Sequence, residues 1–254
     1  MSLNSASIKK ILVRLGIEEL NELQSATLEA IRQDQDLILL SDTGSGKTLA
    51  FLLPVLSMMD KQASGTQALV IVPSRELALQ IEQVFKTMAT GFKVTCCYGG
   101  HLRETEENNL IEAPALIVGT PGRLGDHIRR GSIHTDNIHT LVLDEFDKSL
   151  ELGFQDEMSF IITSLPSIQK RMLTSATAAT EIPGFVGLRD AATLNFLSGE
   201  KSERLLLQQV LSADKDKIET LFRLLSRIGS RSTVVFCNHR EAVERTSGML
   251  REKG

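Results

Sequence analysis

The chain has 254 residues, of which 42% are hydrophobic and 24% are charged. This composition is typical of a soluble globular protein with a sizeable core, and it excludes an intrinsically disordered chain. The formal net charge of −4 excludes a global positive field that would attract nucleic acid or an anionic membrane, so any contact with nucleic acid must be local.

Short apolar runs rich in Val, Ile and Leu are predicted to be strands, and amphipathic segments that follow them are predicted to be helices. Strands that alternate with helices indicate a parallel sheet covered on both faces, which is an α/β fold. In such a sheet the functional groups gather in the loops at the carboxyl ends of the strands. The predicted strands are 36–40, 68–72, 93–98, 115–118, 140–143, 171–174 and 193–197.

A small polar stretch at 199–203 is predicted to be a linker that follows an N-terminal domain of residues 1–198. The strand and helix pattern then restarts within 204–254. Two strands and two helices are too few to close an independent sheet, so we expect an incomplete second domain. Its predicted elements are strand 205–211, helix 214–228, strand 233–237 and helix 240–252.

Residues 41–48 (SDTGSGKT) directly follow the first predicted strand and precede a helix-forming run, which is the context of a phosphate-binding loop. Glycines let backbone N–H groups turn toward phosphate oxygens, and the helix N-terminus adds its dipole. Lys47 is predicted to reach the β and γ phosphates, and the Thr48 hydroxyl to ligate Mg²⁺. A simple glycine-rich turn is the alternative. The predicted nucleotide contacts in this loop are Thr43, Gly44, Ser45, Gly46, Lys47 and Thr48.

An acidic pair, Asp144 and Glu145, follows the apolar strand 140–143. Two carboxylates at the end of a buried strand are costly to desolvate unless a metal or another cation meets them. We predict that Asp144 holds Mg²⁺ through water and that Glu145 is the base that polarises the attacking water. A helix N-cap would explain Asp144 alone, but it would not explain Lys47 and Asp144 together.

These motifs resemble the DEAD-box RNA helicases, and the resemblance extends from the N-terminus to about Cys237. It implies a RecA-like P-loop NTPase domain and the beginning of a second RecA-like domain. The ordered matches are 41–48, 73–78 (PSRELA), 99–100 (GG), 120–124 (TPGRL), 144–147 (DEFD), 175–177 (SAT) and 234–238 (VVFCN).

The resemblance also assigns roles to single residues. Gln24 matches the glutamine that selects adenine, although no aromatic residue stands near Ser7 to stack on the base. Ser175 and Thr177 would bond to Asp147 and link the ATP site to domain closure. Phe146 replaces the family's Ala and is expected to repack locally without altering the chemistry.

The residues that would bind RNA are of types that contact phosphate, and such contacts position a strand without reading its bases. For Arg75, pairing with a neighbouring glutamate on a helix surface is the alternative. The predicted RNA contacts are Arg75, Gly100, Thr120, Gly122 and Arg123.

The predicted function is that of an ATP-dependent RNA helicase, in which ATP hydrolysis is coupled to local duplex unwinding. The family's arginine finger lies in a later motif that this sequence lacks, so we expect a monomer that binds ATP, Mg²⁺ and RNA but hydrolyses ATP slowly. Two alternatives stay open: a naturally truncated RNA-binding or partner-binding module, and a DNA helicase or translocase motor. The cysteines and histidines show no metal spacing, and no apolar stretch reaches the ~18 residues of a membrane helix, so a reduced, cytoplasmic location is expected.

Overall fold

The computed structural model describes residues 4–31, 33, 35–100, 102–178, 181–198, 206, 208–213 and 215–253. The chain divides into two compact units, Met1–Gly199 and Glu200–Gly254. The predicted linker at 199–203 lies outside the described residues. Among the described residues, no helix has the length and apolar character needed to cross a membrane.

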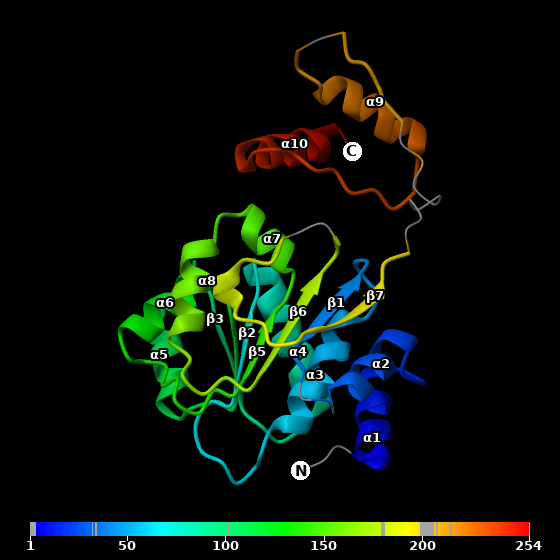
Figure 1. Cartoon of the computed structure of the whole chain (residues 1–254). Helices are drawn as coiled ribbons and strands as arrows, with labels where there is room; N and C mark the ends of the chain where they lie inside the picture. Colours follow the sequence, from blue (N-terminus) through cyan, green and yellow to red (C-terminus); the bar gives the residue numbers. More distant parts are fainter. Residues whose placement is uncertain are drawn as a thin grey trace. The chain divides into compact units, whose positions relative to one another are not determined.

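The larger unit is a seven-stranded sheet in which every pair of neighbours is parallel, with helices on both faces (Figure 1). The spatial order of the strands is β3-β4-β2-β5-β6-β1-β7. All seven predicted strands are present within two residues of their expected bounds, which confirms the α/β fold. The strands are β1 (Leu37–Ser41), β2 (Ala68–Ile71), β3 (Val94–Cys97), β4 (Leu116–Gly119), β5 (Thr140–Leu143), β6 (Lys170–Ser175) and β7 (Ala192–Phe196).

The helices of this unit form two layers because alternate residues of each strand point to opposite faces. In β2, Ala68 and Val70 belong to one apolar cluster, whereas Leu69 and Ile71 belong to the other. The first cluster packs beneath α1 (Ser5–Leu15), α2 (Glu22–Ala30), α3 (Lys47–Met58) and α4 (Arg75–Met88). The second packs beneath α5 (Arg103–Ile111), α6 (Pro121–Arg129), α7 (Phe146–Glu151) and α8 (Gln155–Thr163).

Local sequence fixes where the helices near the carboxyl edge of the sheet begin. The Ser74 side chain accepts a hydrogen bond from the Leu77 amide and caps α4. Pro121 occupies the first turn of α6, where its missing N–H leaves no bond unmade. The first residues of α4 and α6 determine where the loops that follow β2 and β4 end.

The smaller unit contains the two predicted helices but neither predicted strand. Helix α9 (Ile218–Ile228) and helix α10 (Arg240–Lys253) are linked by an ion pair between Glu219 and Lys253 at 2.6 Å. The strand predicted at 233–237 is wrong, and Phe236 there is 91% exposed. The described residues of the strand predicted at 205–211 also form none. A strand needs neighbouring strands for its backbone hydrogen bonds, and the described residues of this unit provide none.

Candidate functional site

The predicted site residues lie along one edge of the larger unit's sheet, at the carboxyl ends of six adjacent strands. They fall into two groups. The nucleotide half follows β1, β6 and β5, and the RNA half follows β2, β4 and β3. In open α/β sheets this edge is where ligands bind.

The phosphate loop connects β1 to α3 and takes a conformation that depends on its glycines. Gly44 and Gly46 have φ values of 81° and 90°, which lie in the left-handed region. Lys47 is buried at the N-terminus of α3, and its Nζ donates hydrogen bonds to the carbonyl oxygens of Ser41 (2.6 Å) and Asp42 (3.0 Å). The loop thus carries a buried cation beside a helix N-terminus, an arrangement that binds phosphate.

Gln24 lies against this loop, on the first turn of α2. Its Nε2 donates to the carbonyl oxygen of Gly46 at 3.3 Å, and a Cβ added to Gly46 would lie 2.6 Å from that nitrogen. Asn21 was not among the predicted site residues, yet its Nδ2 donates to the carbonyl oxygen of Ser45 at 2.8 Å. Asn21 and Gln24 also form a capping box. An Asn followed three residues later by Gln is the sequence signal that could have found this contact.

Asp144 is buried at the end of β5, with 3% of its surface exposed. Its Oδ1 accepts a hydrogen bond from the hydroxyl of Thr174 at 2.5 Å. The pKa of Asp144 is raised to about 6, chiefly by burial and also by the neighbouring Glu145 carboxylate, against the lowering effects of Thr174 and Lys47. Thr174, at the end of β6, was missed by the sequence reasoning.

Glu145 begins α7 with φ 50°, an uncommon backbone conformation for a residue that is not glycine. Its backbone N–H donates to the hydroxyl of Thr174 at 3.1 Å. The same threonine therefore positions both acidic residues.

Asp147 connects α7 to the loop after β6. Its Oδ2 accepts hydrogen bonds from the hydroxyl of Thr177 at 3.1 Å and from the backbone N–H of Ala176 at 3.2 Å. The expected bond from Ser175 takes another form, because its hydroxyl donates to the carbonyl oxygen of Thr177 at 2.8 Å. Phe146 is buried in the second apolar cluster, so its ring is part of the packing under α7.

In the RNA half, Arg75 opens α4 and its guanidinium lies 5.1 Å from the centre of the Tyr98 ring. A Cβ added to Gly100, whose φ is 96°, would lie 3.8 Å from the Arg75 Nη1. The segments after β2 and β3 are therefore adjacent. Glu82, which could have paired with Arg75, instead pairs with Lys86 at 2.9 Å.

Thr120 is the N-cap residue of α6, and Gly122 in the first turn is exposed. A Cβ on Gly122 would meet nothing within 4 Å, so its backbone faces open space. Arg123, in contrast, has a side chain that is only 14% exposed and pairs with Glu106 at 3.1 Å. Four of the five predicted RNA residues thus present backbone or side-chain groups at the surface, and Arg123 faces inward.

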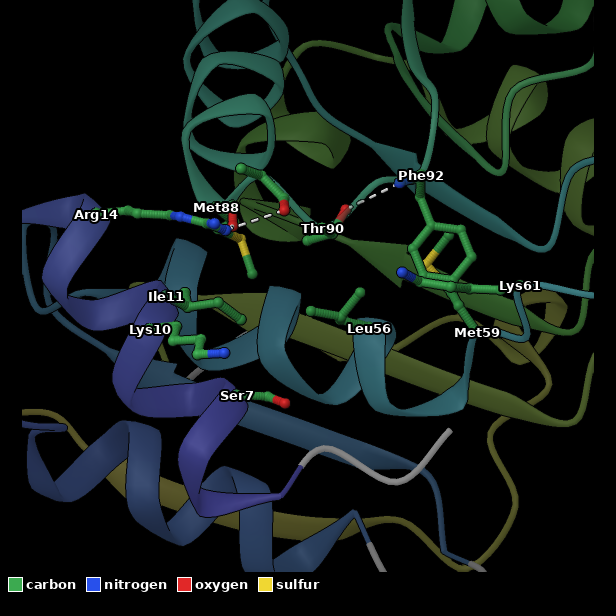
Figure 2. Close-up of a pocket in the computed structure, with 11 residues that line it drawn as sticks. Ser7, Lys10, Ile11, Arg14, Leu56, Met59, Lys61, Met88, Thr90 and Phe92 are labelled. Atoms are coloured by element: carbon green, nitrogen blue, oxygen red, sulfur yellow. Dashed lines mark hydrogen bonds between the residues drawn. The ribbon is translucent and has the colours of Figure 1, made fainter.

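A separate hollow of about 160 Å³ lies at the opposite edge of the sheet, near the C-terminal ends of α3 and α4 (Figure 2). Arg14 donates to the carbonyl oxygens of Met88 (2.9 Å) and Ala89 (3.0 Å), and Lys61 lies 5.8 Å from the centre of the Phe92 ring. Arg14 binds the last carbonyl oxygens of α4 and offsets the partial negative charge of that helix end. The cation therefore has a structural role that explains its position.

Three comparisons with known proteins agree with this geometry. The family model described as DEAD/DEAH box helicase matches residues 21–183. The chain is 34% identical over 97% of its length to an ATP-dependent RNA helicase CshA from Listeria monocytogenes. It is 36% identical over 94% of its length to the ATP-dependent RNA helicase DbpA from Escherichia coli. The chain spans about half the length of these curated relatives, 48% and 54% respectively.

The fold itself is similar to that of a solved structure. The crystal structure of a DEAD box protein from Methanococcus jannaschii matches with a TM-score of 0.68 at 24% identity, covering 100% of this chain and 69% of that one. The parallel sheet flanked by helices is therefore a RecA-like fold.

Proposed function

The chain belongs to the DEAD/DEAH box helicase family, and from this premise we propose that it binds ATP with Mg²⁺ and the backbone of RNA. One observation carries the proposal. The phosphate loop, the acidic pair and the segments after β2, β4 and β3 all open on the same edge of one rigid sheet. A nucleotide and a nucleic-acid strand held there would lie on neighbouring strand ends, so that a change at one could reach the other through the sheet.

The nucleotide half is suited to ATP. Lys47 would donate to the β and γ phosphates, and the backbone N–H groups of residues 43–46 would surround them. Gln24 lies beside the loop at Gly46, and its side-chain amide offers both a donor and an acceptor, the combination that recognition of an adenine edge requires.

The residues around Asp144 fit a magnesium ion. The Asp144 carboxylate is 3% exposed and its pKa is raised, so the nearby Lys47 only partly offsets its burial, and the hydroxyl of Thr174 that donates to it is neutral. Asp144 would hold the ion through water, and the Thr48 hydroxyl would ligate it directly. When bound, the ion neutralises charge on the phosphates. Glu145, positioned by Thr174, would orient and deprotonate the attacking water.

The RNA half is suited to phosphates and not to base edges. Arg75, Thr120 and the exposed backbone at Gly100 and Gly122 supply guanidinium, hydroxyl and close-approach groups, which bind the backbone of a strand. We therefore propose binding without sequence preference.

As part of a longer protein, the chain would act in an ATP-dependent RNA helicase that couples ATP hydrolysis to local duplex unwinding. Phosphoryl transfer needs positive charge on the transition state, often from an arginine finger worth ~10³ to 10⁵ in rate. In the proposed mechanism a second domain supplies that charge, so this chain alone would hydrolyse ATP slowly. We propose a cytoplasmic monomer.

The test is direct binding by the 254-residue chain. A fluorescent ATP analogue should bind in the presence of Mg²⁺ and be displaced by ATP more readily than by GTP. A fluorescein-labelled single-stranded RNA of about ten nucleotides should bind more tightly than the DNA of the same sequence. Equal affinity for RNA and DNA would favour a DNA helicase or translocase, and no nucleotide binding would refute the proposal.

A further inference from the structure

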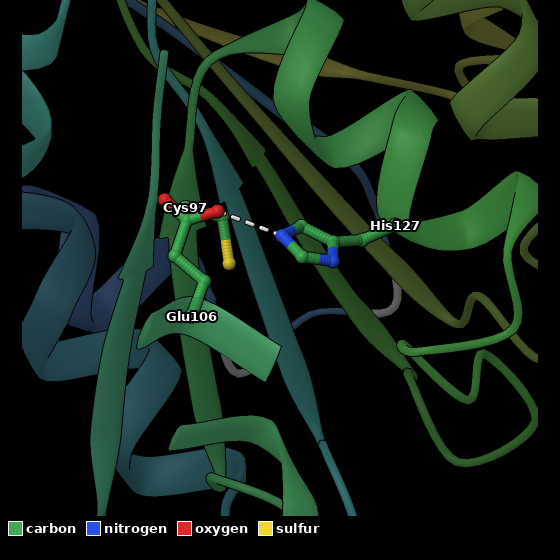
Figure 3. A group of neighbouring side chains, drawn as sticks. All are labelled: Cys97, Glu106 and His127. Carbon is green, nitrogen blue, oxygen red and sulfur yellow. Dashed lines mark hydrogen bonds and ion pairs between the residues drawn. The ribbon is translucent and has the colours of Figure 1, made fainter. Parts of the chain in front are cut away.

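The carboxylate of Glu106 joins two of the segments proposed to bind RNA. Figure 3 shows its contact with His127 on α6. Its Oε1 accepts a hydrogen bond from the backbone N–H of Tyr98 at 2.8 Å, directly before the Gly99-Gly100 turn. Its Oε2 accepts from Arg123 Nη1 at 3.1 Å and lies 2.7 Å from His127 Nε2. One side chain on α5 therefore ties the loop after β3 to helix α6.

The protonation of this cluster follows from its contacts. An ionised carboxylate can only accept, so the imidazole of His127 donates from Nε2. Its Nδ1 is buried and has no hydrogen-bond partner within the part of the chain that the structure describes. A doubly protonated ring would leave a buried N–H without an acceptor there, which favours the neutral ring with its proton on Nε2. The cluster then holds one negative charge on Glu106 and one positive charge on Arg123.

This charge balance restrains Arg123. The side chain of Glu106 is 2% exposed and that of Arg123 is 14% exposed. If the guanidinium left to bind a phosphate, the buried Glu106 carboxylate would lose its ion pair with Arg123. Removing one partner from a buried ion pair is strongly unfavourable. Arg123 is therefore held by the protein and is not free to follow a ligand.

We propose that Glu106 is a positioning residue for RNA binding and that Arg123 acts through it. The pair holds the backbones of 98–100 and 120–122 in a fixed relation, so that their groups meet successive phosphates. This inference rests on the proposed RNA binding. It assigns the Arg123 guanidinium to holding protein segments in place and not to contacting RNA.

A metal site is the competing interpretation of the same cluster. Ligand atoms of Cys97, Glu106 and His127 lie within 4.8 Å of one another, and these residue types bind zinc. The Arg123 guanidinium opposes a second cation on the same carboxylate oxygen. Burial also raises the pKa of the Cys97 thiol far above its usual value, so the thiol stays protonated. The contacts favour the ion pair.

The test uses the 254-residue chain with E106Q, R123Q and the double variant. In E106Q the amide oxygen can still accept from the Tyr98 N–H, but the side chain carries no charge to pair with Arg123. If the pair is a scaffold, each single variant should weaken RNA binding by roughly tenfold, and the double variant should be no weaker than either, because residues that act as one unit are not additive. Affinity for the fluorescent ATP analogue should not change.

Other outcomes overturn the inference. If Arg123 contacts phosphate itself, R123Q weakens binding while E106Q leaves it unchanged or tightens it. E82Q is the matched control, because Glu82 also loses an ion pair, with Lys86, at a similar distance on another helix. A zinc-dependent rise in Tm that C97S abolishes would replace the ion pair with a metal site.

A second measurement needs no variant. Hydrogen exchange at the Tyr98 amide should be as slow with RNA bound as without it, and faster exchange on RNA binding would show that Glu106 is released. If the wild-type chain binds no RNA, both the proposed RNA binding and this inference are refuted. If the wild type binds RNA and E106Q binds equally well, only this inference fails.

Discussion

Two buried carboxylates at the same edge of the sheet have opposite surroundings. Asp144, in the nucleotide half, is 3% exposed, receives a hydrogen bond from the hydroxyl of Thr174, and has another carboxylate beside it. Glu106, in the RNA half, is 1% exposed and contacts a guanidinium, an imidazole and an amide. The protein pairs the Glu106 charge directly with a guanidinium, whereas the nearby Lys47 only partly offsets the burial of Asp144.

This difference distinguishes a structural carboxylate, Glu106, from a carboxylate proposed to bind a ligand, Asp144. A carboxylate neutralised by the protein holds two segments together and has nothing left to offer a ligand. A buried carboxylate whose charge is only partly offset destabilises the fold, and a bound metal ion would reduce that cost. The contrast predicts opposite effects of removing the two charges.

The largest effect should come from breaking the neutralised pair. E106A should lower the free energy of unfolding by about 3 to 5 kcal/mol, because it breaks the ion pair between the buried Glu106 carboxylate and Arg123. Urea unfolding of the purified chain measures this. E112A is the control, since the side chain of Glu112 is 91% exposed. A change below about 1 kcal/mol in E106A would mean that the pair behaves like a surface salt bridge.

Removal of the buried cation of the nucleotide half should mainly affect ligand binding. K47A should raise the Kd for ATP by about 10- to 100-fold, because hydrogen bonds from a charged donor contribute about 1.5 to 3 kcal/mol. Titration with a fluorescent ATP analogue in Mg²⁺ gives the value, with K86A as a surface-lysine control. RNA affinity should stay as it is, and an equal loss of RNA binding would argue against two separable halves.

Removal of the partly offset charge of Asp144 should stabilise the protein. D144N should raise the free energy of unfolding at pH 7.5 by up to about 3 kcal/mol, because a pKa raised from 3.8 to about 6 means that the ionised form is disfavoured in the folded state. The same variant should lose the Mg²⁺ dependence of nucleotide binding. Thermal unfolding and magnesium titration check the two parts, and a destabilised D144N would contradict the contrast with Glu106.

The stability gain of D144N should depend on pH. The pKa of Asp144 in the folded chain, about 6, lies above its ordinary value of 3.8, so the folded state takes up the proton first as the pH falls. The difference between wild type and D144N should therefore be full above pH 6, shrink by at most about 1.4 kcal/mol per pH unit below it, and vanish near pH 3.8. Urea unfolding at several pH values tests this, and a difference that grows at low pH would reverse the sign.

Sequence patterns predicted the larger unit well because five of its strands, β2 to β6, are buried at every residue and most of them appear as continuous apolar runs. The strand at 140–143 has the predicted bounds. The same reasoning failed at 233–237, where the apolar run has no neighbouring strand among the described residues of its unit. A run of residues can favour the extended conformation, but only tertiary contacts provide its hydrogen-bond partners.

The cluster around Glu106 could not have been predicted from the chain. Glu106 stands in the run RETEE at 103–107, which has the pattern of a solvated helix face. Its burial depends on α5 packing beside β3, and its partners come from α6, about 20 residues later. Thr174 was missed for a similar reason, because only the pairing of β5 with β6 brings it beside Asp144.

The sequence by itself therefore determined the order of the strands along the chain, the phosphate loop and the acidic pair, because each depends on residues that are adjacent in the chain. The tertiary structure decided which buried carboxylate forms a close ion pair with a side chain of the protein. That pairing depends on contacts between distant segments, and it distinguishes Glu106, which is paired with Arg123, from Asp144, which we propose holds a metal ion through water.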